Sequence, residues 1–442
     1  MEPLPCGHIA IAGAGRICGH LFGVPEDIED VEYYRSLLGD GMRWELRCDG
    51  CAKDGAAEVF EVCEGCVRRV EEDCEFVGWR GEPGILERSE PVDQTVSTSP
   101  LPSRASTVVS IAPVAAQPGV WLLLNHKGKI IRWDADAGRA STRAHCAVPD
   151  DSDRRAWMRH QAGPRLHSSA DGRFAAVVND FGRHGAVVDL TTGKTTMVLD
   201  GGNYHPETVP FSLAFAEHHG RTVVIHRTAW NRLDISDPAT GDLLTERTLA
   251  PAERGGPRPA HYLDYFHGAL LVSPNGRRIA DDGWVWHPVG IPAVWRLDDW
   301  LSSNLWESED GPSRLNVCGR TSYWDQPMTW LDEARVAICG IGDDADSIRP
   351  GVRIFDVGHA RRDGLWGMQT AIELGRFEGP SGRLFADGGR LYSADTSGLS
   401  IWDPEQGSRL GTVPGFSPTH FHPGTGELVQ LTGRTLRRWA AA

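Results

Sequence analysis

The sequence predicts a mainly β protein in which a small α+β domain precedes a ring of repeated sheets. Seven of the ten cysteines lie before residue 75, in a segment that also contains helix-like stretches. Residues 81–106 are rich in Pro, Ser and Thr, a composition typical of linkers. From residue 107 onward, short apolar runs alternate with turn residues, and similar runs recur. The predicted divisions are therefore residues 1–80, 81–106 and 107–442.

The first domain contains two CxxC sequences, Cys48–Cys51 and Cys63–Cys66, each with Gly before its second Cys. A CxxC turn points two sulfurs at one ion, and Zn²⁺ takes four ligands in a tetrahedron. The stretch CEGCVRRVEEDC from Cys63 predicts a helix, whose N-terminal potential favours thiolates. We therefore expect Cys48, Cys51, Cys63 and Cys66 to hold a structural zinc ion. A CxxC turn, here Cys48–Cys51, followed by two ligands at the start of a helix, here Cys63 and Cys66, resembles treble-clef and ribbon zinc modules.

The string Cys-Gly-His occurs twice, and it supplies Cys6, His8, Cys18 and His20. Residues i and i+2 of a strand share a face, and the Ala-Gly-Ala-Gly stretch between the copies favours a hairpin. These four residues are expected to form a second site, or one Cys-Gly-His pair completes the site of one CxxC pair. In a third interpretation the two cysteines are small apolar residues of a packed hairpin. One or two zinc ions are expected.

Residues 25–41, PEDIEDVEYYRSLLGDG, predict a helix between these clusters. Pro25 suits its first turn, the acidic residues suit its N-terminus and Gly39 suits its end. So small a segment has little apolar core, so we expect the metal to supply most of its stability.

The second domain repeats one local pattern, a strand ending in Asp with Gly four residues later. The copies are Asp134/Gly138, Asp189/Gly193, Asp237/Gly241 and Asp403/Gly407. Asp opens a turn by bonding the backbone two residues on, and Gly adopts the left-handed conformation that lets the next strand begin. Upstream hairpin turns precede apolar strands, as at residues 169–173 and 273–277. Seven units with spacings of about 36 to 61 residues predict a seven-bladed β-propeller.

The strand ends Arg-Trp-Asp (132–134) and Ile-Trp-Asp (401–403), together with the turns SADG and SPNG, resemble those of WD-repeat propellers. The resemblance covers about three quarters of the chain and implies a protein-interaction scaffold. It also implies that the last strand closes the ring with the first unit, which would remove exposed sheet edges.

Four tryptophans in and beside the long connection 298–327 are candidates for a protein-binding surface: Trp300, Trp306, Trp324 and Trp330. Long loops on rigid scaffolds often carry recognition, although the same residues also suit simple loop packing. His261, Asp264 and His267 are expected to be ordinary satisfied side chains. The sequence contains no GxSxG, phosphate loop, HExxH or dinucleotide fingerprint, so no enzymatic activity is expected.

The charge distribution limits the classes of partner that the protein is expected to bind. Residues 1–90 contain 20 acidic and 9 basic side chains, and the whole chain has a formal net charge of −15. Such a segment repels nucleic-acid phosphates and anionic membranes, so a protein partner is expected. Without an apolar span or secretory signal, the expected location is cytoplasmic. Two alternatives stay open: a propeller hydrolase or lactonase with His and Asp on the ring axis, and a RING-like adaptor whose propeller recognises the target.

Overall fold

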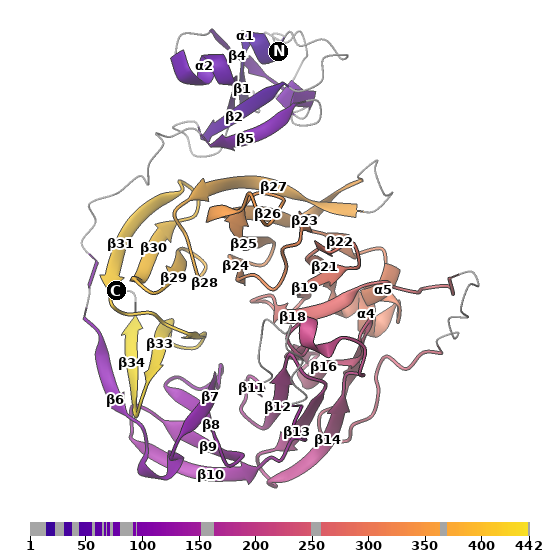
Figure 1. Ribbon diagram of the computed structural model, residues 1–442, viewed down its shortest axis with the longest axis vertical. Coiled ribbons are helices and arrows are strands. Elements are labelled where there is room, and N and C mark those ends of the chain that lie inside the picture. The colour runs from indigo at the N-terminus through magenta and orange to yellow at the C-terminus, as the bar shows by residue number, and fades with distance from the viewer. Residues whose placement is uncertain are drawn as a thin grey trace.

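The computed structural model is mainly β. It describes the following residues: 15–22, 31–37, 44–54, 58–63, 66–67, 69–70, 74–79, 92–93, 95–151, 163–248, 258–362 and 369–440. One five-stranded sheet belongs to the N-terminal segment, and the other sheets are arranged around a common centre (Figure 1). We call these two parts the module and the ring.

The module contains a five-stranded sheet in the order β4-β1-β3-β2-β5. Its strands are β1 (Gly15–Cys18), β2 (Glu32–Leu37), β3 (Trp44–Cys48), β4 (Val59–Val62) and β5 (Glu75–Trp79), and its helices are α1 (Gly19–Phe22) and α2 (Asp49–Asp54). Buried Ile17, Leu46 and Val62, from the three adjacent strands β1, β3 and β4, form the centre of a small apolar cluster.

The helix predicted over residues 25–41 is wrong where the structure describes this segment. Glu32–Leu37 form β2, which pairs antiparallel with β3 and parallel with β5. Tyr33 is 3% exposed and pairs with Cys48. The segment Val-Glu-Tyr-Tyr has strong β propensity, and burial between two strands outweighs the capping pattern that favoured a helix.

The ring is built largely from four-stranded antiparallel sheets. The first contains β7 (Val108–Pro113), β8 (Val120–Asn125), β9 (Lys129–Asp134) and β10 (Arg139–His145). The second contains β11 (Gly163–Ser168), β12 (Phe174–Asp180), β13 (His184–Asp189) and β14 (Lys194–Asp200). A third contains β28 (Arg383–Ala386), β29 (Leu391–Ala394), β30 (Gly398–Asp403) and β31 (Ser408–Pro414). A three-stranded sheet contains β15 (Leu213–His218), β16 (Arg221–Ala229) and β17 (Arg232–Ser236), and the bridge Ser236–Leu243 lies at its outer edge.

The largest sheet joins two such units. One contains β18 (Phe266–Val272), β19 (Arg278–Val285), β20 (Val289–Gly290), β21 (Ala293–Arg296), β22 (Leu315–Asn316) and β23 (Arg320–Thr321), and the other contains β24 (Met328–Trp330), β25 (Arg335–Ile341), β26 (Arg349–Arg362) and β27 (Gln369–Glu378). They meet at the pair Asn316–Thr370. The short helices of the ring are η1 (Ser103–Ala105), η2 (Pro206–Thr208), α4 (Leu297–Ser302) and α5 (Glu307–Asp310).

The repeated turns form as the sequence predicts. Asp134 accepts a hydrogen bond from the N–H of Ala137 at 2.8 Å, and Gly138 has φ 65°. That N–H lies three residues on, whereas the carboxylates of the equivalent residues Asp189, Asp237 and Asp403 accept N–H groups two residues on, as predicted. The predicted hairpin turn at 169–173 joins β11 to β12, with Gly172 at φ 72°. Side-chain and glycine chemistry thus define each unit locally.

The last sheet contains strands from both ends of the ring's chain. Its order is β32 (His420–His422), β33 (Glu427–Thr432), β34 (Thr435–Ala440) and β6 (Ser97–Pro100). Trp439 Nε1 donates to the carbonyl of Asp93 at 2.6 Å. The last strand was expected to pair with the first unit, whereas β34 pairs with β6, which precedes that unit. β6 falls within the segment predicted as linker, so the sheets of the ring begin before residue 107.

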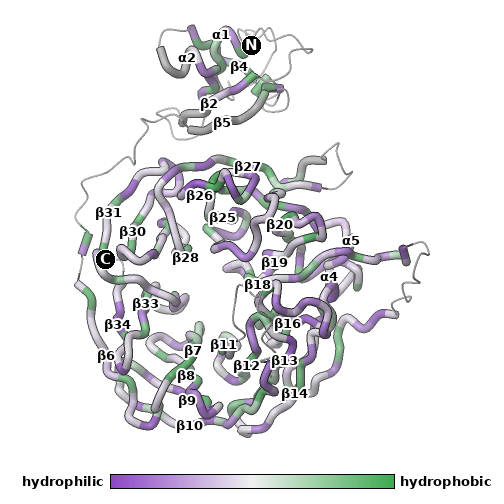
Figure 2. Tube along the Cα trace, in the orientation of Figure 1, coloured by the Kyte–Doolittle hydropathy of each residue, from purple (hydrophilic) through white to green (hydrophobic). Residues whose placement is uncertain are grey.

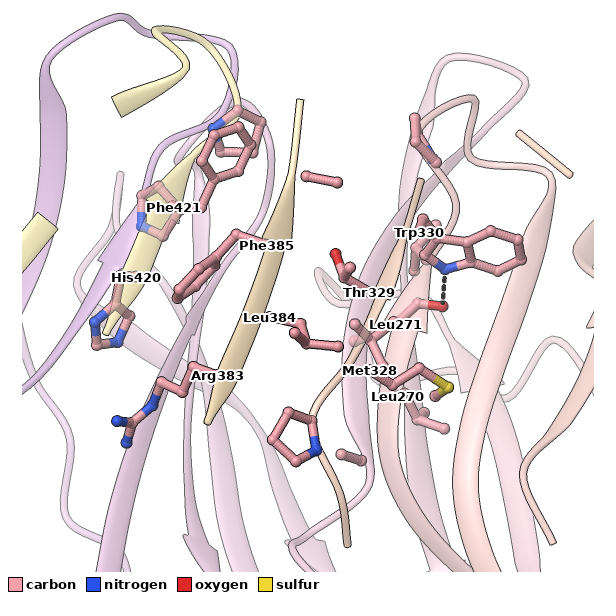
Figure 3. Close-up of a pocket in the computed structure, with 18 of the residues that line it drawn as sticks. Leu270, Leu271, Met328, Thr329, Trp330, Arg383, Leu384, Phe385, His420 and Phe421 are labelled. Carbon is pink, nitrogen blue, oxygen red and sulfur yellow. Dashed lines mark hydrogen bonds between the residues drawn. The ribbon is translucent and has the colours of Figure 1, made fainter. Parts of the chain in front are cut away.

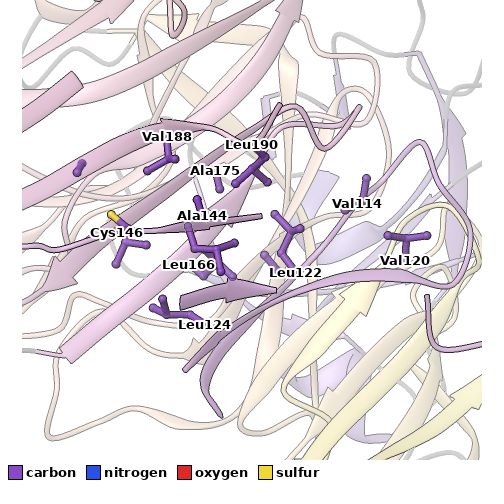
Figure 4. Close-up of a cluster of buried hydrophobic side chains, with 14 residues drawn as sticks. Val114, Val120, Leu122, Leu124, Ala144, Cys146, Leu166, Ala175, Val188 and Leu190 are labelled. Carbon is purple, nitrogen blue, oxygen red and sulfur yellow. The ribbon is translucent and has the colours of Figure 1, made fainter. Parts of the chain in front are cut away.

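Apolar side chains fill the spaces between neighbouring sheets. In the cluster of Figure 4, Leu122 and Ile130 of one sheet pack with Leu166, Ala175 and Val188 of the next. Figure 2 shows apolar segments recurring around the ring between hydrophilic turns. Burying such side chains contributes roughly 1.5–3 kcal/mol each, so apolar packing is a major source of the ring's stability.

Candidate metal centre

Two adjacent strands of the module run directly into short helices. β1 and β3 are parallel, with Ile17 opposite Leu46, and they continue into α1 and α2. The carboxyl ends of parallel strands lie at the same edge of a sheet. Cys18 and Cys48, the last residues of these strands, therefore lie close together.

Four ligand atoms converge at this edge. One sulfur or nitrogen from each of Cys18, His20, Cys48 and Cys51 lies within 4.8 Å of all the others. His20 Nδ1 is 2.8 Å from the sulfur of Cys51 and 3.7 Å from that of Cys48. The N–H of Cys48 also donates to the sulfur of Cys18 at 3.3 Å. Three sulfurs and one imidazole nitrogen are a donor set that can hold a metal ion.

The environment of the site differs between its thiols. Cys18 and Cys51 are buried, and burial raises the pKa of Cys51 to about 12. Burial also opposes ionisation of Cys48, but hydrogen bonds from the backbone and thiol of Cys51 outweigh it and lower the pKa of Cys48. A bound cation would deprotonate its thiol ligands outright. With four protein ligands, the site has no open position for a substrate.

The second CxxC pair lies at the other end of β1. β4 is antiparallel to β1, with Val62 opposite Gly15 and Val59 opposite Cys18. Cys63, which follows Val62, is therefore placed at the beginning of β1. Its sulfur lies 3.8 Å from that of Cys66, and the N–H of Val67 bonds to the carbonyl of Cys63 at 3.2 Å, as expected for a helix start.

The structure therefore groups the ligands differently from the four-cysteine set expected first. Cys18 and His20 complete the site of Cys48 and Cys51, which is one of the arrangements that the sequence left open. Cys18 ends a strand and His20 lies in a helix, so the two do not share a strand face as expected. Cys6 and His8 lie outside the described residues.

The four candidate interface tryptophans are mainly packing residues. Trp300 and Trp330 are 0% and 6% exposed, so they do not offer a surface to a partner. Trp324 donates to the carbonyl of Thr208, and Trp306 stacks on His261 with ring centroids 4.3 Å apart. Trp300 and Trp330 are therefore core residues, whereas Trp306 and Trp324 are half-buried.

An aromatic cluster that the sequence analysis missed lies next to Trp324, which stacks on Trp284. Its exposed members are Tyr204 and Trp286, at 44% and 41%. Tyr204 stacks on Phe266 at 5.9 Å, and Phe266 stacks on Trp284 at 4.5 Å. Trp284 and Trp286 are two residues apart, but the other members come from distant connections and strands, so the sequence does not show that they meet. We call Tyr204, Trp230, Phe266, Trp284, Trp286 and Trp324 the aromatic patch.

Unusual backbone conformations and carboxylates surround the aromatic patch. His205 and Asp325, each next to a patch residue in the chain, have positive φ values of 48° and 56°. Such conformations in non-glycine residues concentrate at functional sites. The carboxylate of Glu207 lies 3.2 Å from the imidazole of His205. The Glu207 side chain is 6% exposed, so this pair supports the backbone beside the patch from below its surface.

A cavity of about 1890 Å³ lies at the centre of the ring, between the innermost strands of the sheets (Figure 3). His167 and His420 line it, and burial, with nearby Arg165, lowers the pKa of each to about 3. Burial raises the pKa of Asp282, also in the lining, to about 7. Apolar side chains such as Leu384 and Phe385 face the cavity as well.

The three residues in the sequence HYLDYFHG do not form one site. His261 pairs with Asp310 at 2.9 Å, Asp264 pairs with Arg258, and buried His267 pairs with Asp281 at 2.6 Å. Each makes a separate contact, but among the described residues Nε2 of buried His267 has no hydrogen-bond partner, so His267 is satisfied only in part.

Compared with models of known families and with curated proteins, the chain matches none. Within the described ranges, every helix is too short or too polar to cross a membrane.

Proposed function

We propose that the protein is a non-enzymatic scaffold, a seven-bladed WD-repeat-like β-propeller that binds a protein partner and carries a zinc-stabilised module. Six sheets surround the cavity, and the largest consists of two units joined at one pair of residues, which makes seven. The closure of the last sheet by β6 supports this arrangement, because propellers protect their edges in this way.

Zinc is the ion that the module's donor set favours. Thiolates together with imidazole in a four-ligand set suit Zn²⁺, and a closed set acts structurally. Cys63 and Cys66 provide two further sulfurs at the opposite end of β1. We propose that they hold a second ion, with Cys6 and His8 as the expected remaining ligands. These two residues lie outside the described ranges.

The aromatic patch is the observation that carries the binding proposal. Exposed aromatic side chains on a rigid support are favoured at the centres of protein interfaces. The chain's formal net charge of −15 favours a partner with Lys or Arg side chains. The proposed partner surface is therefore basic with an apolar centre.

The enzymatic alternative has less support from the central cavity. A histidine acting as a general base requires a pKa near the working pH. His167 and His420 have pKa values lowered to about 3, and the charged neighbours that lower them are Arg165 and, for His420, also Arg383. This setting does not favour either histidine as a general base. Asp282 is the lining group whose pKa, raised by burial to about 7, lies in that range, and it has no such histidine as its base.

The adaptor alternative requires ligand pairs that alternate between two ions along the chain. In the module, the Cys18–His20 pair shares its site with the next pair along the chain, Cys48–Cys51. In a cross-brace, neighbouring pairs along the chain would bind different ions. Because these two neighbouring pairs share one site, a RING-like cross-brace is disfavoured.

A surface variant tests the binding proposal. Affinity capture from the native host is carried out with the wild type, with Tyr204→Ser/Trp286→Ser, and with Val198→Ser as control. Val198 is 79% exposed on β14 and is not part of the patch. We expect a basic partner to be retained by the wild type and control and reduced at least tenfold by the double variant. The captured protein is then purified, and its affinity for each of the three forms is measured by titration.

Equal affinity for the wild type and the double variant would overturn the proposed surface. Unchanged unfolding curves for all three forms establish that the loss reflects contact and not folding.

A further inference from the structure

A histidine pair in the ring lies beside a carboxylate from a different element. The ligand atoms of His218, His219 and Asp298 all lie within 4.8 Å of one another. His218 ends β15 and His219 follows it in the turn to β16, whereas Asp298 lies in the first turn of α4. The three residues are separate from the thiolate site and the aromatic patch.

The turn holds the two imidazoles next to each other. His218 pairs with Arg221, so His219 and Gly220 form a two-residue hairpin loop. Both have positive φ, 48° and 73°, as in the type I′ turn that favours Asn-Gly. The ring centroids of His218 and His219 are 4.2 Å apart. An imidazole thus occupies a place where Asn is the favoured residue.

Apolar packing between α4 and the β15–β16 hairpin fixes the position of Asp298 relative to the turn. Leu297 and Trp300, both 0% exposed, belong to the same apolar cluster as Ala216 and Ile225 of the β15–β16 hairpin. Asp298 follows Leu297 directly, so its position is coupled to that of the hairpin. Ligands supported by packed elements in this way are pre-organised for binding.

The contact between His218 and Asp298 is not a hydrogen bond. Nε2 of His218 lies 3.3 Å from Oδ1 of Asp298, but among the described residues this buried nitrogen has no hydrogen-bond partner. A buried ring nitrogen without a hydrogen bond is costly. An ion bound by both groups removes that cost, because it takes the lone pair of the nitrogen and the charge of the carboxylate.

We propose that His218, His219 and Asp298 form an open binding site for a divalent transition metal ion. Two imidazoles and one carboxylate suit Zn²⁺, Ni²⁺ or Fe²⁺, and three ligands leave positions for water or a partner's side chain. The side chain of Asp298 is 54% exposed, so the ion exchanges with solvent. This site therefore differs from the closed thiolate site of the module in both ligands and access.

Nickel titration of the full chain tests the proposal by calorimetry. We expect wild-type protein to bind one more equivalent of Ni²⁺ than the His219→Asn variant, or to bind it at least tenfold more tightly. Asn suits the type I′ turn, so this variant keeps the hairpin while it removes a ligand. Asp298→Asn, which removes the charge on α4, should weaken binding to a similar degree.

His359→Asn is the matched control. His359 forms an exposed pair with Asp356 at 2.7 Å. The control should bind Ni²⁺ as the wild type does. Identical titrations for the wild type, His219→Asn and Asp298→Asn would overturn the proposed site. All variants keep the module's four ligands, so this outcome is independent of the zinc proposal.

Discussion

The module and the ring use the last residue of a strand in two different ways. In the module, β1 and β3 end at Cys18 and Cys48, whose sulfurs point toward a shared site. In the ring, β9 ends at Asp134, whose carboxylate accepts a backbone N–H of the following turn. One strand end places thiols where they could bind an ion, and the other provides a hydrogen-bond acceptor for the backbone of the next turn.

The difference reflects how much apolar surface each part buries. Several strands of the module are only four or five residues long, and one small cluster forms its centre. The ring has separate clusters between successive sheets, with fully buried side chains such as Trp121 and Trp402. A small core needs an additional stabilising ligand, whereas the ring needs only well-formed turns between well-packed sheets.

Metal removal should produce the largest effect and should affect the module alone. Structural zinc contributes about 10–16 kcal/mol in small zinc-binding peptides, so Cys51→Ser or chelation is expected to unfold the module. Hydrogen exchange of β1 and β3 and the zinc content of the purified protein measure this. The unfolding transition of the ring should stay unchanged.

Cys146→Ala is the control for this experiment. Cys146 is buried in the ring, where burial raises the pKa of its thiol to about 11. This variant should keep its zinc. Fewer than about 0.5 zinc ions per wild-type chain would contradict a structural ion that occupies the site of every molecule.

The sequence predicts features that depend on nearby residues. The Asp and Gly marks, such as Asp189 with Gly193, predicted the turns. The pairing of the last strand was expected, but its partner β6 carries no such mark and lies in the segment predicted as linker. All four residues of the thiolate cluster were also among the expected ligands.

Long-range pairing explains what the sequence did not predict. The grouping of the cysteines depends on β4 running antiparallel to β1, which places Cys63 far from Cys48 along the sheet. The direction in which distant strands pair is not encoded in the spacing of CxxC sequences. Similarly, Trp300 and Tyr204 differ in exposure because of how distant elements pack.

Acid should destabilise the ring through His167 and His420. Their pKa values of about 3 lie below the ordinary value of 6.5, so between these values the unfolded chain binds more protons. Stability is therefore full above pH 6.5 and is lost as the pH falls toward 3. At pH 5 the loss is about 2 kcal/mol for each histidine.

Urea unfolding at pH 8 and pH 5, followed by tryptophan fluorescence, measures this loss. His167→Gln/His420→Gln should reduce the difference between the two pH values by about 4 kcal/mol relative to the wild type. The thiolate site is the same in both proteins, so its own response to acid cancels. An equal pH dependence in the two proteins would show that these histidines are not buried in their neutral form.

Substitutions in the turns of the ring should have the smallest effect on stability. They test whether the ring depends on the last residues of its strands as the module does. Asp134→Ala removes the acceptor for the N–H of Ala137 and should destabilise the ring by about 1 kcal/mol. Asp134→Asn keeps an acceptor and loses the ion pair with Arg139, whose side chain is 82% exposed. That pair is worth roughly 0–1 kcal/mol, so the amide variant should unfold close to the wild type. If both variants unfold together at much lower urea, the charge of Asp134 matters more than its hydrogen bond. In that case strand ends in the ring are as indispensable as those that hold the ion in the module.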